Sequence, residues 1–315
     1  LKKEPKYQES LPFLYAKMAV AYSKTAQHDN ALSYYRLLEQ IFKDDGEKLC
    51  QIKMKIADIY YDTYKFDMAK GVYIGIVTSS YAKANGLMSA YLKLLNIAEE
   101  KNAPDAEIAD YFTKAMKLTD NITQTTLLAE FYFKYALYND DIDEVEKARQ
   151  YYKKCVEIDN TSANKFLSSS YSNLAELALE DENKNDAITY YQNAFNADKA
   201  SYNNEGAYDT ATRLALLYKN VNNDKAVEYY KTALEYAQNS NDEFYIISAS
   251  LNLGDFYYEI RRNEQSLKYY LYANNFASKT SKENSDKIKA RLHDIKLRLG
   301  EANYNNLVNT MGNNG

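Results

Sequence analysis

A pair of large, mostly aromatic residues recurs along this chain at an almost constant interval. The seven pairs are Tyr34-Tyr35, Val72-Tyr73, Tyr111-Phe112, Tyr151-Tyr152, Tyr190-Tyr191, Tyr229-Tyr230 and Tyr269-Tyr270. Their second members follow one another at spacings of 38, 39, 40, 39, 39 and 40 residues. In six of the seven copies a small residue, Ala or Ser, stands four positions before the second member. An apolar residue stands three positions after it in every copy. Offsets of four and three trace one face of a helix, so each copy predicts a helix that buries its ring.

A second set of apolar markers precedes each pair and predicts another helix there. The clearest are Met18-Ala19 with Tyr22, Ile56-Ala57 with Tyr60, Leu174-Ala175 with Ala178, Leu214-Ala215 with Tyr218, and Leu253-Gly254 with Tyr257. The third and fourth copies are looser, around Leu94-Leu95 and Tyr135. Short polar turns separate the two helices, and the chain has only 9 Gly and 3 Pro in 315 residues. Because helix breakers are so few, the sequence predicts an all-α fold of seven helix-turn-helix units.

At these positions the chain resembles the tetratricopeptide repeat (TPR) family. The copy that is most similar to the family pattern consists of Leu253-Gly254, Tyr257, Ser266, Tyr270 and Ala273. The resemblance covers residues 12 to 279, with two departures: the helix-ending Pro of the family is missing, and the unit is near 40 residues long. Both departures fit longer helices, as in the kinesin light chains and the Rap-like peptide-pheromone receptors of Gram-positive bacteria.

The resemblance implies a right-handed α-solenoid of seven TPR-like repeats over residues 1–280. The repeats are expected at 12–43, 46–83, 85–118, 121–158, 162–199, 203–239 and 242–279. Beyond them, Ile288, Leu292, Ile295 and Leu299 recur at spacings of four, three and four. This stripe predicts a capping helix over 281–310 that covers the last apolar face, followed by a frayed tail over 311–315. Gly300 either ends this helix or permits a kink, after which Ala302 to Val308 continue it.

The resemblance also implies a concave groove lined by the first helix of each repeat, in which an extended peptide binds. Counting two residues before the small marker of each first helix gives Lys17, Lys55, Lys93, Phe133, Asn173, Arg213 and Asn252. Tyr61, Tyr132 and Tyr258 are the aromatic anchors expected by spacing. Asn can hold a peptide backbone and Arg can bind a carboxylate, so we expect an acidic or carboxylate-bearing peptide. The alternative is that the long basic side chains only cover helix surface. The carboxylate clamp of co-chaperones is matched only in part, because Asp209 stands where its second basic residue belongs.

The composition argues against several other classes of protein. Two His and two Cys supply too few ligands and nucleophiles for most metal or covalent chemistry, so we expect no enzyme activity, metal or cofactor. Cys50 and Cys155 are expected to be reduced core thiols. A net charge of −5 at a pI of 5.4 argues against nucleic-acid binding. The sequence contains no 18-residue apolar run, so it predicts no membrane span.

The sequence therefore leaves two functions open for this chain. The first is a protein- or peptide-binding scaffold or adaptor without enzyme activity. The second is a peptide-gated regulator whose DNA-binding or effector domain lies outside this chain. The sequence opens at Leu1 rather than Met, which indicates a fragment or a processed product. We expect a cytoplasmic, bacterial protein, and the sequence leaves open whether it forms a homodimer.

Overall fold

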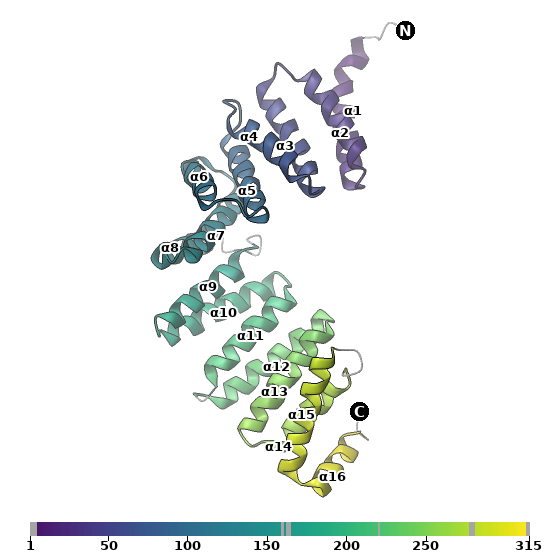
Figure 1. The fold of residues 1–315 in the computed structure, drawn as a ribbon, viewed down its shortest axis with the longest axis vertical. Coiled ribbons are helices and arrows are strands. Elements are labelled where there is room, and N and C mark those ends of the chain that lie inside the picture. Colours follow the sequence, from purple (N-terminus) through teal and green to yellow (C-terminus); the bar gives the residue numbers. More distant parts are fainter. Residues whose placement is uncertain (1–4, 159–160, 162–164, 220, 277–280, 313–315) are drawn as a thin grey trace. The chain divides into compact units, whose positions relative to one another are not determined.

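The computed structural model describes residues 5–158, 161, 165–219, 221–276 and 281–312 (Figure 1). Over these ranges the chain forms sixteen α-helices and one short 3-10 helix, with no strand. The predicted all-α fold is therefore confirmed. The chain divides into two compact units, which we call unit 1 (Leu1–Tyr135) and unit 2 (Ala136–Gly315), and the division falls inside one helix.

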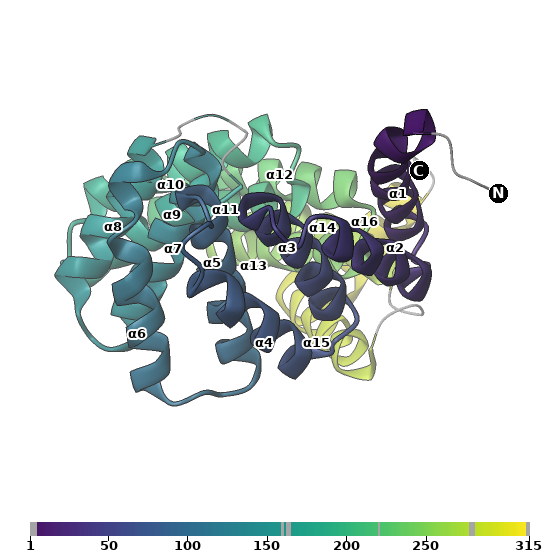
Figure 2. The same ribbon diagram turned by 90° about the horizontal axis from the view of Figure 1, so that it is seen from above.

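The helices of each unit follow one another in chain order. Unit 1 contains α1 (Pro5–Lys24), α2 (His28–Ile41), α3 (Gly46–Asp62), α4 (Phe66–Val77), α5 (Ala84–Glu100), α6 (Asp105–Met116), the 3-10 helix η1 (Thr119–Asn121) and the first part of α7 (Thr125–Asp141). Unit 2 contains the rest of α7, α8 (Val145–Ile158), α9 (Leu167–Glu180), α10 (Lys184–Ala200), α11 (Asn204–Tyr218), α12 (Asn223–Ser240), α13 (Glu243–Glu259), α14 (Asn263–Asn274), α15 (Lys282–Leu299) and α16 (Glu301–Gly312). In unit 2, consecutive helices from α9 to α15 pack against one another (Figures 1 and 2).

The expectation of one superhelix over 1–280 did not foresee this division. A solenoid repeat contacts only its neighbours, so the contacts between each two successive repeats determine how strongly those repeats are held together. The boundary at Tyr135 lies in the copy whose first-helix markers are weak in the sequence. The seven repeat ranges given above remain a prediction.

The aromatic pairs form the packing frame that their spacing predicts. All seven second members are buried, with exposed fractions between 0 and 5% (Tyr35, Tyr73, Phe112, Tyr152, Tyr191, Tyr230 and Tyr270). The small residues before them are buried too, except Ile108, which is half-buried. Cys155 belongs to this frame and is buried, whereas Cys50 is only half-buried and so is not a core thiol.

Polar caps and left-handed residues define where the helices begin and end. The Asn183 side chain accepts a hydrogen bond from the Asp186 N–H at the start of α10, and Asn203 and Asn222 cap α11 and α12 in the same way. At six of the turns between paired helices, one non-glycine residue has φ between 48° and 60°. These residues are Ala26, Tyr64, Asn102, Asp143, Glu182 and Arg261. A left-handed residue is a common helix end, so these turns form regularly although glycine is scarce.

The C-terminal end shows the first of the two alternatives for Gly300, a helix end. It consists of two helices, α15 and α16, because Gly300 between them has φ of +79°, which ends the first helix. The buried side chains of Ile288 and Ile295 pack α15 against the preceding helices. Met311 and Gly312 of the expected frayed tail belong to α16, and residues 313–315 lie outside the described ranges.

Two glycines give a direct test of this packing. A Cβ added to Gly254 in α13 would lie 2.6 Å from Cε1 of Tyr270, whose ring is 1% exposed. We therefore expect Gly254→Ala to lower the free energy of unfolding by about 1–3 kcal/mol through overpacking. Gly71 in α4 has no atom within 4 Å of such a Cβ, so Gly71→Ala should instead stabilise the protein by about 0.5–1 kcal/mol. Urea unfolding measures both changes, and a neutral Gly254→Ala would contradict the close contact.

Candidate functional site

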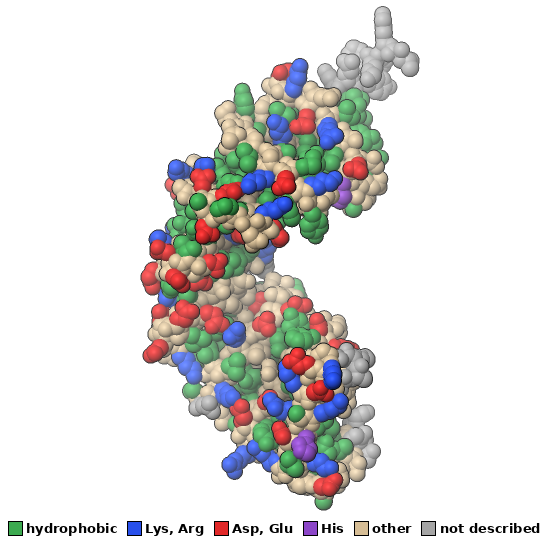
Figure 3. All heavy atoms as spheres, viewed as in Figure 1, with side chains coloured by type: hydrophobic (Ala, Val, Ile, Leu, Met, Phe, Trp, Pro, Cys, Tyr) green, Lys and Arg blue, Asp and Glu red, His purple; other side chains and the backbone are tan. Residues whose placement is uncertain are grey.

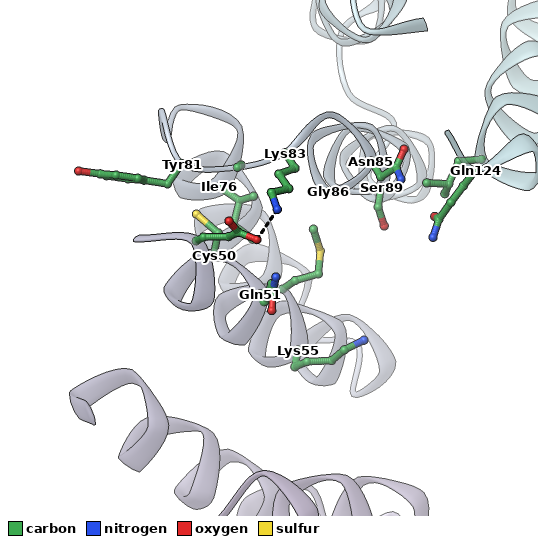
Figure 4. A pocket seen from close by; sticks show the side chains of 14 residues that line it. Cys50, Gln51, Lys55, Ile76, Tyr81, Lys83, Asn85, Gly86, Ser89 and Gln124 are labelled. Carbon is green, nitrogen blue, oxygen red and sulfur yellow. Dashed lines mark ion pairs between the residues drawn. The ribbon is translucent and has the colours of Figure 1, made fainter. Parts of the chain in front are cut away.

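The first helices of unit 1 form an open pocket of about 470 Å³, which we call the α3–α5 pocket (Figure 4). Glu47, Gln51 and Lys55 line it from α3, and Asn85 and Ser89 line it from α5. Residues four apart on a helix share one face, so each helix presents a polar stripe to the same space. Apolar side chains also line it, among them Met54, Ala82, Leu127 and Ile76, the last from α4.

Several polar contacts hold the rim of this pocket in place. Lys83 Nζ lies 2.6 Å from Glu47 Oε1 and links the loop before α5 to α3 (Figure 4). Asn85 donates from Nδ2 to Thr123 Oγ1 at 2.8 Å and accepts from the Thr123 N–H at 3.1 Å. By contrast, Gln51 is exposed, and Lys55 makes only a long 3.4 Å ion pair with Asp58 on its own helix. The rim is thus fixed, while these two side chains remain able to meet a ligand.

The other residues predicted for the groove of unit 1 lie on α1, α3, α5 and α7. Lys93 lies with Nζ 4.3 Å from the centre of the Tyr61 ring, so the structure brings these two together. Burial raises the pKa of Tyr61, and a hydrogen bond with Asn96 opposes that shift. Lys17 is exposed and lies 4.4 Å from the Phe13 ring of its own helix. Tyr132 and its neighbour Phe133 are half-buried on α7, and the Tyr132 hydroxyl is hydrogen-bonded to Thr119.

Two of the candidates in unit 2 already have structural partners. Arg213 on α11 is ion-paired with Glu176 on α9 at 3.3 Å, and Glu176 also accepts a hydrogen bond from the Tyr191 hydroxyl. Tyr258 on α13 is covered by Arg298 of α15, whose guanidinium carbon lies 3.3 Å from the ring centre. Arg298 also donates to the Tyr258 carbonyl at 2.5 Å.

The contact of Arg213 belongs to a pattern that occurs again in the next part of unit 2. Tyr270 donates to Asp255 at 2.7 Å, and Arg291 Nε lies 2.6 Å from the same carboxylate oxygen. A tyrosine, an acid and an arginine therefore join successive helix pairs in both places. This arrangement favours a structural role for Arg213, in which it links neighbouring helix pairs. It agrees with the alternative that the long basic side chains only cover helix surface.

Asn173 lines a second cavity, of about 300 Å³, which we call the Asp198 cavity. Ser168, Ser169 and Ser172 line it from α9, and Thr210 and Asp209 line it from α11. The Asn173 amide also makes a hydrogen bond with the Tyr152 hydroxyl. Asn252, the other predicted asparagine, is half-buried on α13 and is not among the residues that line the cavity.

Asp198 is buried in the wall of this cavity, with an exposed fraction of 1%. Its Oδ1 accepts from Asn203 Nδ2 at 2.8 Å, and its Oδ2 lies 3.4 Å from Thr210 Oγ1. Ser168 is a third hydrogen-bond partner. Burial raises the pKa of Asp198 above its ordinary value, whereas these neutral partners lower it.

The sequence analysis missed Asp198 and also two residues that line the α3–α5 pocket, Gln51 and Asn85. A signal for Asp198 exists: it follows Ala187, Tyr191 and Ala194 at spacings of four, three and four, on the buried stripe of α10. A charged residue on such a stripe is uncommon and needs partners. Gln51 and Asn85 carry no such mark, because their role depends on how close α3 and α5 lie.

Comparison with known proteins supports the repeat assignment. A family model for the tetratricopeptide repeat matches residues 129–162. The C-terminal part of a TPR repeat-containing protein from Cytophaga hutchinsonii aligns at a TM-score of 0.59 and 16% identity, over 86% of this chain and 98% of that chain. The segment 129–162 therefore matches a tetratricopeptide repeat, and the fold of the chain is that of a TPR solenoid. No curated protein sequence matches it.

Two further solved structures are similar to this TPR chain. The apo form of RapI aligns at a TM-score of 0.55 and 16% identity, over 89% of this chain and 99% of that chain. A signal transduction ATPase with numerous domains from Pyrococcus horikoshii, which carries a tetratricopeptide repeat sensor, aligns at a TM-score of 0.52 and 15% identity. That alignment covers 97% of this chain and 48% of the ATPase. At these identities the similarity shows the TPR fold.

The described residues bear on two further classes of site, metal centres and membrane spans. Within them, no three His, Cys, Asp or Glu side chains come together as metal ligands. None of the helices in the described ranges has the length and apolarity needed to cross a bilayer. On the face drawn in Figure 3, acidic and basic side chains are interspersed.

Proposed function

We propose that this TPR chain is a scaffold or adaptor without enzyme activity that binds an extended peptide segment of a partner protein on its first helices. The α3–α5 pocket is the observation that carries the proposal. Its apolar part can take a side chain of the peptide, and its polar stripes can pair with the peptide backbone. Exposed Gln51 offers both a donor and an acceptor, which suits backbone recognition without strict dependence on sequence.

The ligand class that we propose for unit 1 is an acidic or carboxylate-bearing peptide. Lys55 lines the pocket, and Lys93 lies two helical turns beyond Asn85 on α5. Both lysines extend from first helices of unit 1, where a peptide carboxylate can approach them. An exposed charge pair of this kind adds little affinity, so its main effect is on selectivity and on salt dependence.

Selection from a library of random linear peptides followed by affinity measurement tests this proposal. For a selected peptide, we expect Gln51→Ala/Lys55→Ala to weaken binding at least tenfold, which is about 1.4 kcal/mol. Lys114→Ala is the matched control, because Lys114 is an exposed lysine on the second helix α6 that is paired with Asp110 on its own helix at 2.6 Å. The control should keep the affinity within a factor of two.

Two outcomes would contradict separate parts of the proposal. Equal affinity of wild type and the double variant would remove the α3–α5 pocket as the binding face. Selected peptides without enrichment in Asp or Glu, or binding that does not weaken with added salt, would remove the acidic ligand class.

A peptide-gated regulator is the second candidate, because the fold is similar to that of RapI and of the ATPase from Pyrococcus horikoshii with a tetratricopeptide repeat sensor. A ligand that binds one conformation of a regulator more tightly than another shifts their population. Small-angle scattering with and without the selected peptide distinguishes the two functions. A change in the radius of gyration supports a regulator, and an unchanged radius supports a scaffold.

A further inference from the structure

The Asp198 cavity has a charge opposite to that of the lysine-bearing helices of unit 1. Of the residues that line it, two are acidic, Asp198 and Asp209, and one is basic, Lys165. Lys165 lies with Nζ 4.9 Å from the centre of the Phe166 ring, and no ion pair joins it to Asp198 among the described residues. Within the described ranges, the buried carboxylate therefore has neutral hydrogen-bond partners and no cation.

An ionised carboxylate is costly to bury unless a cation or several donors compensate for the lost water. Asn203, Thr210 and Ser168 supply part of this compensation. A structural role in the turn between α10 and α11 would explain these three contacts. It does not explain why an acid lines a polar cavity of about 300 Å³.

We propose that the Asp198 cavity is a binding subsite for a primary ammonium group of a peptide ligand, either its N-terminus or a lysine side chain. An ammonium group has three donors and no acceptor, and the cavity offers carboxylate, hydroxyl and amide oxygens. Ser169, Ser172 and Asn173 on α9 line the same cavity. The proposal deepens the proposed function, since it names a ligand group for the first helices of unit 2.

The position of Asp209 supports the same charge preference. It stands where the carboxylate clamp of related TPR proteins has a basic residue, and here it lines the cavity together with Asp198. Arg213, the matched arginine of that clamp, is paired with Glu176. The cavity thus presents two acids and one lysine, Lys165, and the neighbouring Arg213 is already paired with Glu176.

Two small amines serve as probes: n-butylammonium for a lysine side chain and glycine amide for a peptide N-terminus. Binding to the full chain is measured by ligand-observed NMR, with n-butanol as the uncharged counterpart. We expect at least one amine to bind at least tenfold more tightly than n-butanol. Tighter binding of glycine amide assigns the N-terminus, and tighter binding of n-butylammonium assigns lysine. Amines that bind no better than n-butanol would overturn the proposal.

Asp198→Asn should weaken the binding of the better amine at least tenfold. Asp224→Asn is the matched control in the same unit, because the Asp224 side chain is 91% exposed, and it should leave the binding unchanged. Unchanged affinity in Asp198→Asn would overturn the proposal. If that variant does not fold, the comparison of amines with n-butanol on the wild type decides alone. Loss of this subsite with intact binding of selected peptides at the α3–α5 pocket would leave the proposed function standing.

Discussion

Replacing Tyr230 by alanine is expected to lower the free energy of unfolding of unit 2 by about 3–5 kcal/mol. Tyr230 is 4% exposed and belongs to a cluster that includes Leu253 and Phe256, whose ring centre lies 5.3 Å from that of Tyr230. Truncation removes the buried ring and leaves a cavity that helices on both sides cannot fill without moving. Denaturant unfolding followed by circular dichroism measures the loss.

The adjacent Tyr229 is the matched control for this prediction. It is half-buried and stacks on Tyr218 with ring centres 5.6 Å apart, so it contacts the edge of the cluster. Because less of its surface leaves water on folding, Tyr229→Ala should cost clearly less than Tyr230→Ala. Equal costs for the two variants would show that the packing frame has been assigned to the wrong member of the pair.

Alkaline pH is expected to unfold this protein steeply, because so many phenols are buried. Burial raises the pKa of Tyr230 to about 12, and it also raises the pKa values of Tyr73, Tyr152, Tyr191 and Tyr270. An unfolded tyrosine titrates near pH 10. Between these values the unfolded chain loses the proton and the folded chain keeps it, so stability falls as the pH rises. Below pH 10 these tyrosines are protonated in both the folded and the unfolded chain. They therefore contribute no pH dependence to stability in that range.

The expected size of this effect follows from the two pKa values. For Tyr230 alone, the difference of two pH units corresponds to roughly 3 kcal/mol lost between pH 10 and pH 12. The other buried tyrosines add to it. Urea unfolding at several pH values, with absorbance at the tyrosinate wavelength recorded alongside helicity, checks the prediction. Tyr230→Phe should lose correspondingly less stability over this pH range. Full ionisation of the tyrosines in a chain that keeps its helicity would contradict the prediction.

The core of each helix pair was predictable from the sequence because its signal is local. A small residue, a ring and a second small residue at offsets of four and three are enough to place Tyr191 and Tyr270 inside. The two C-terminal helices were less predictable, since Gly300 permits either a helix end or a kink, and the packing of α15 decides between them.

The candidate site was predictable only in part, since it depends on contacts between residues far apart in sequence. Spacing placed Lys55 on the face that lines the α3–α5 pocket. It did not reveal that Arg213 pairs with Glu176 on a different helix, or that Arg298 of α15 covers Tyr258. These partners lie 37 and 40 residues away, where no helical period connects them.

Amide hydrogen exchange in the presence of a selected peptide tests the central claim, that ligands bind on the first helices, most directly. We expect the peptide to slow exchange over residues 47–55 of α3 and 85–93 of α5 while leaving the second helices α2 and α6, which do not line the pocket, unchanged. Protection confined to α2 and α6, with none on α3 and α5, would contradict this account of how the chain binds its partner.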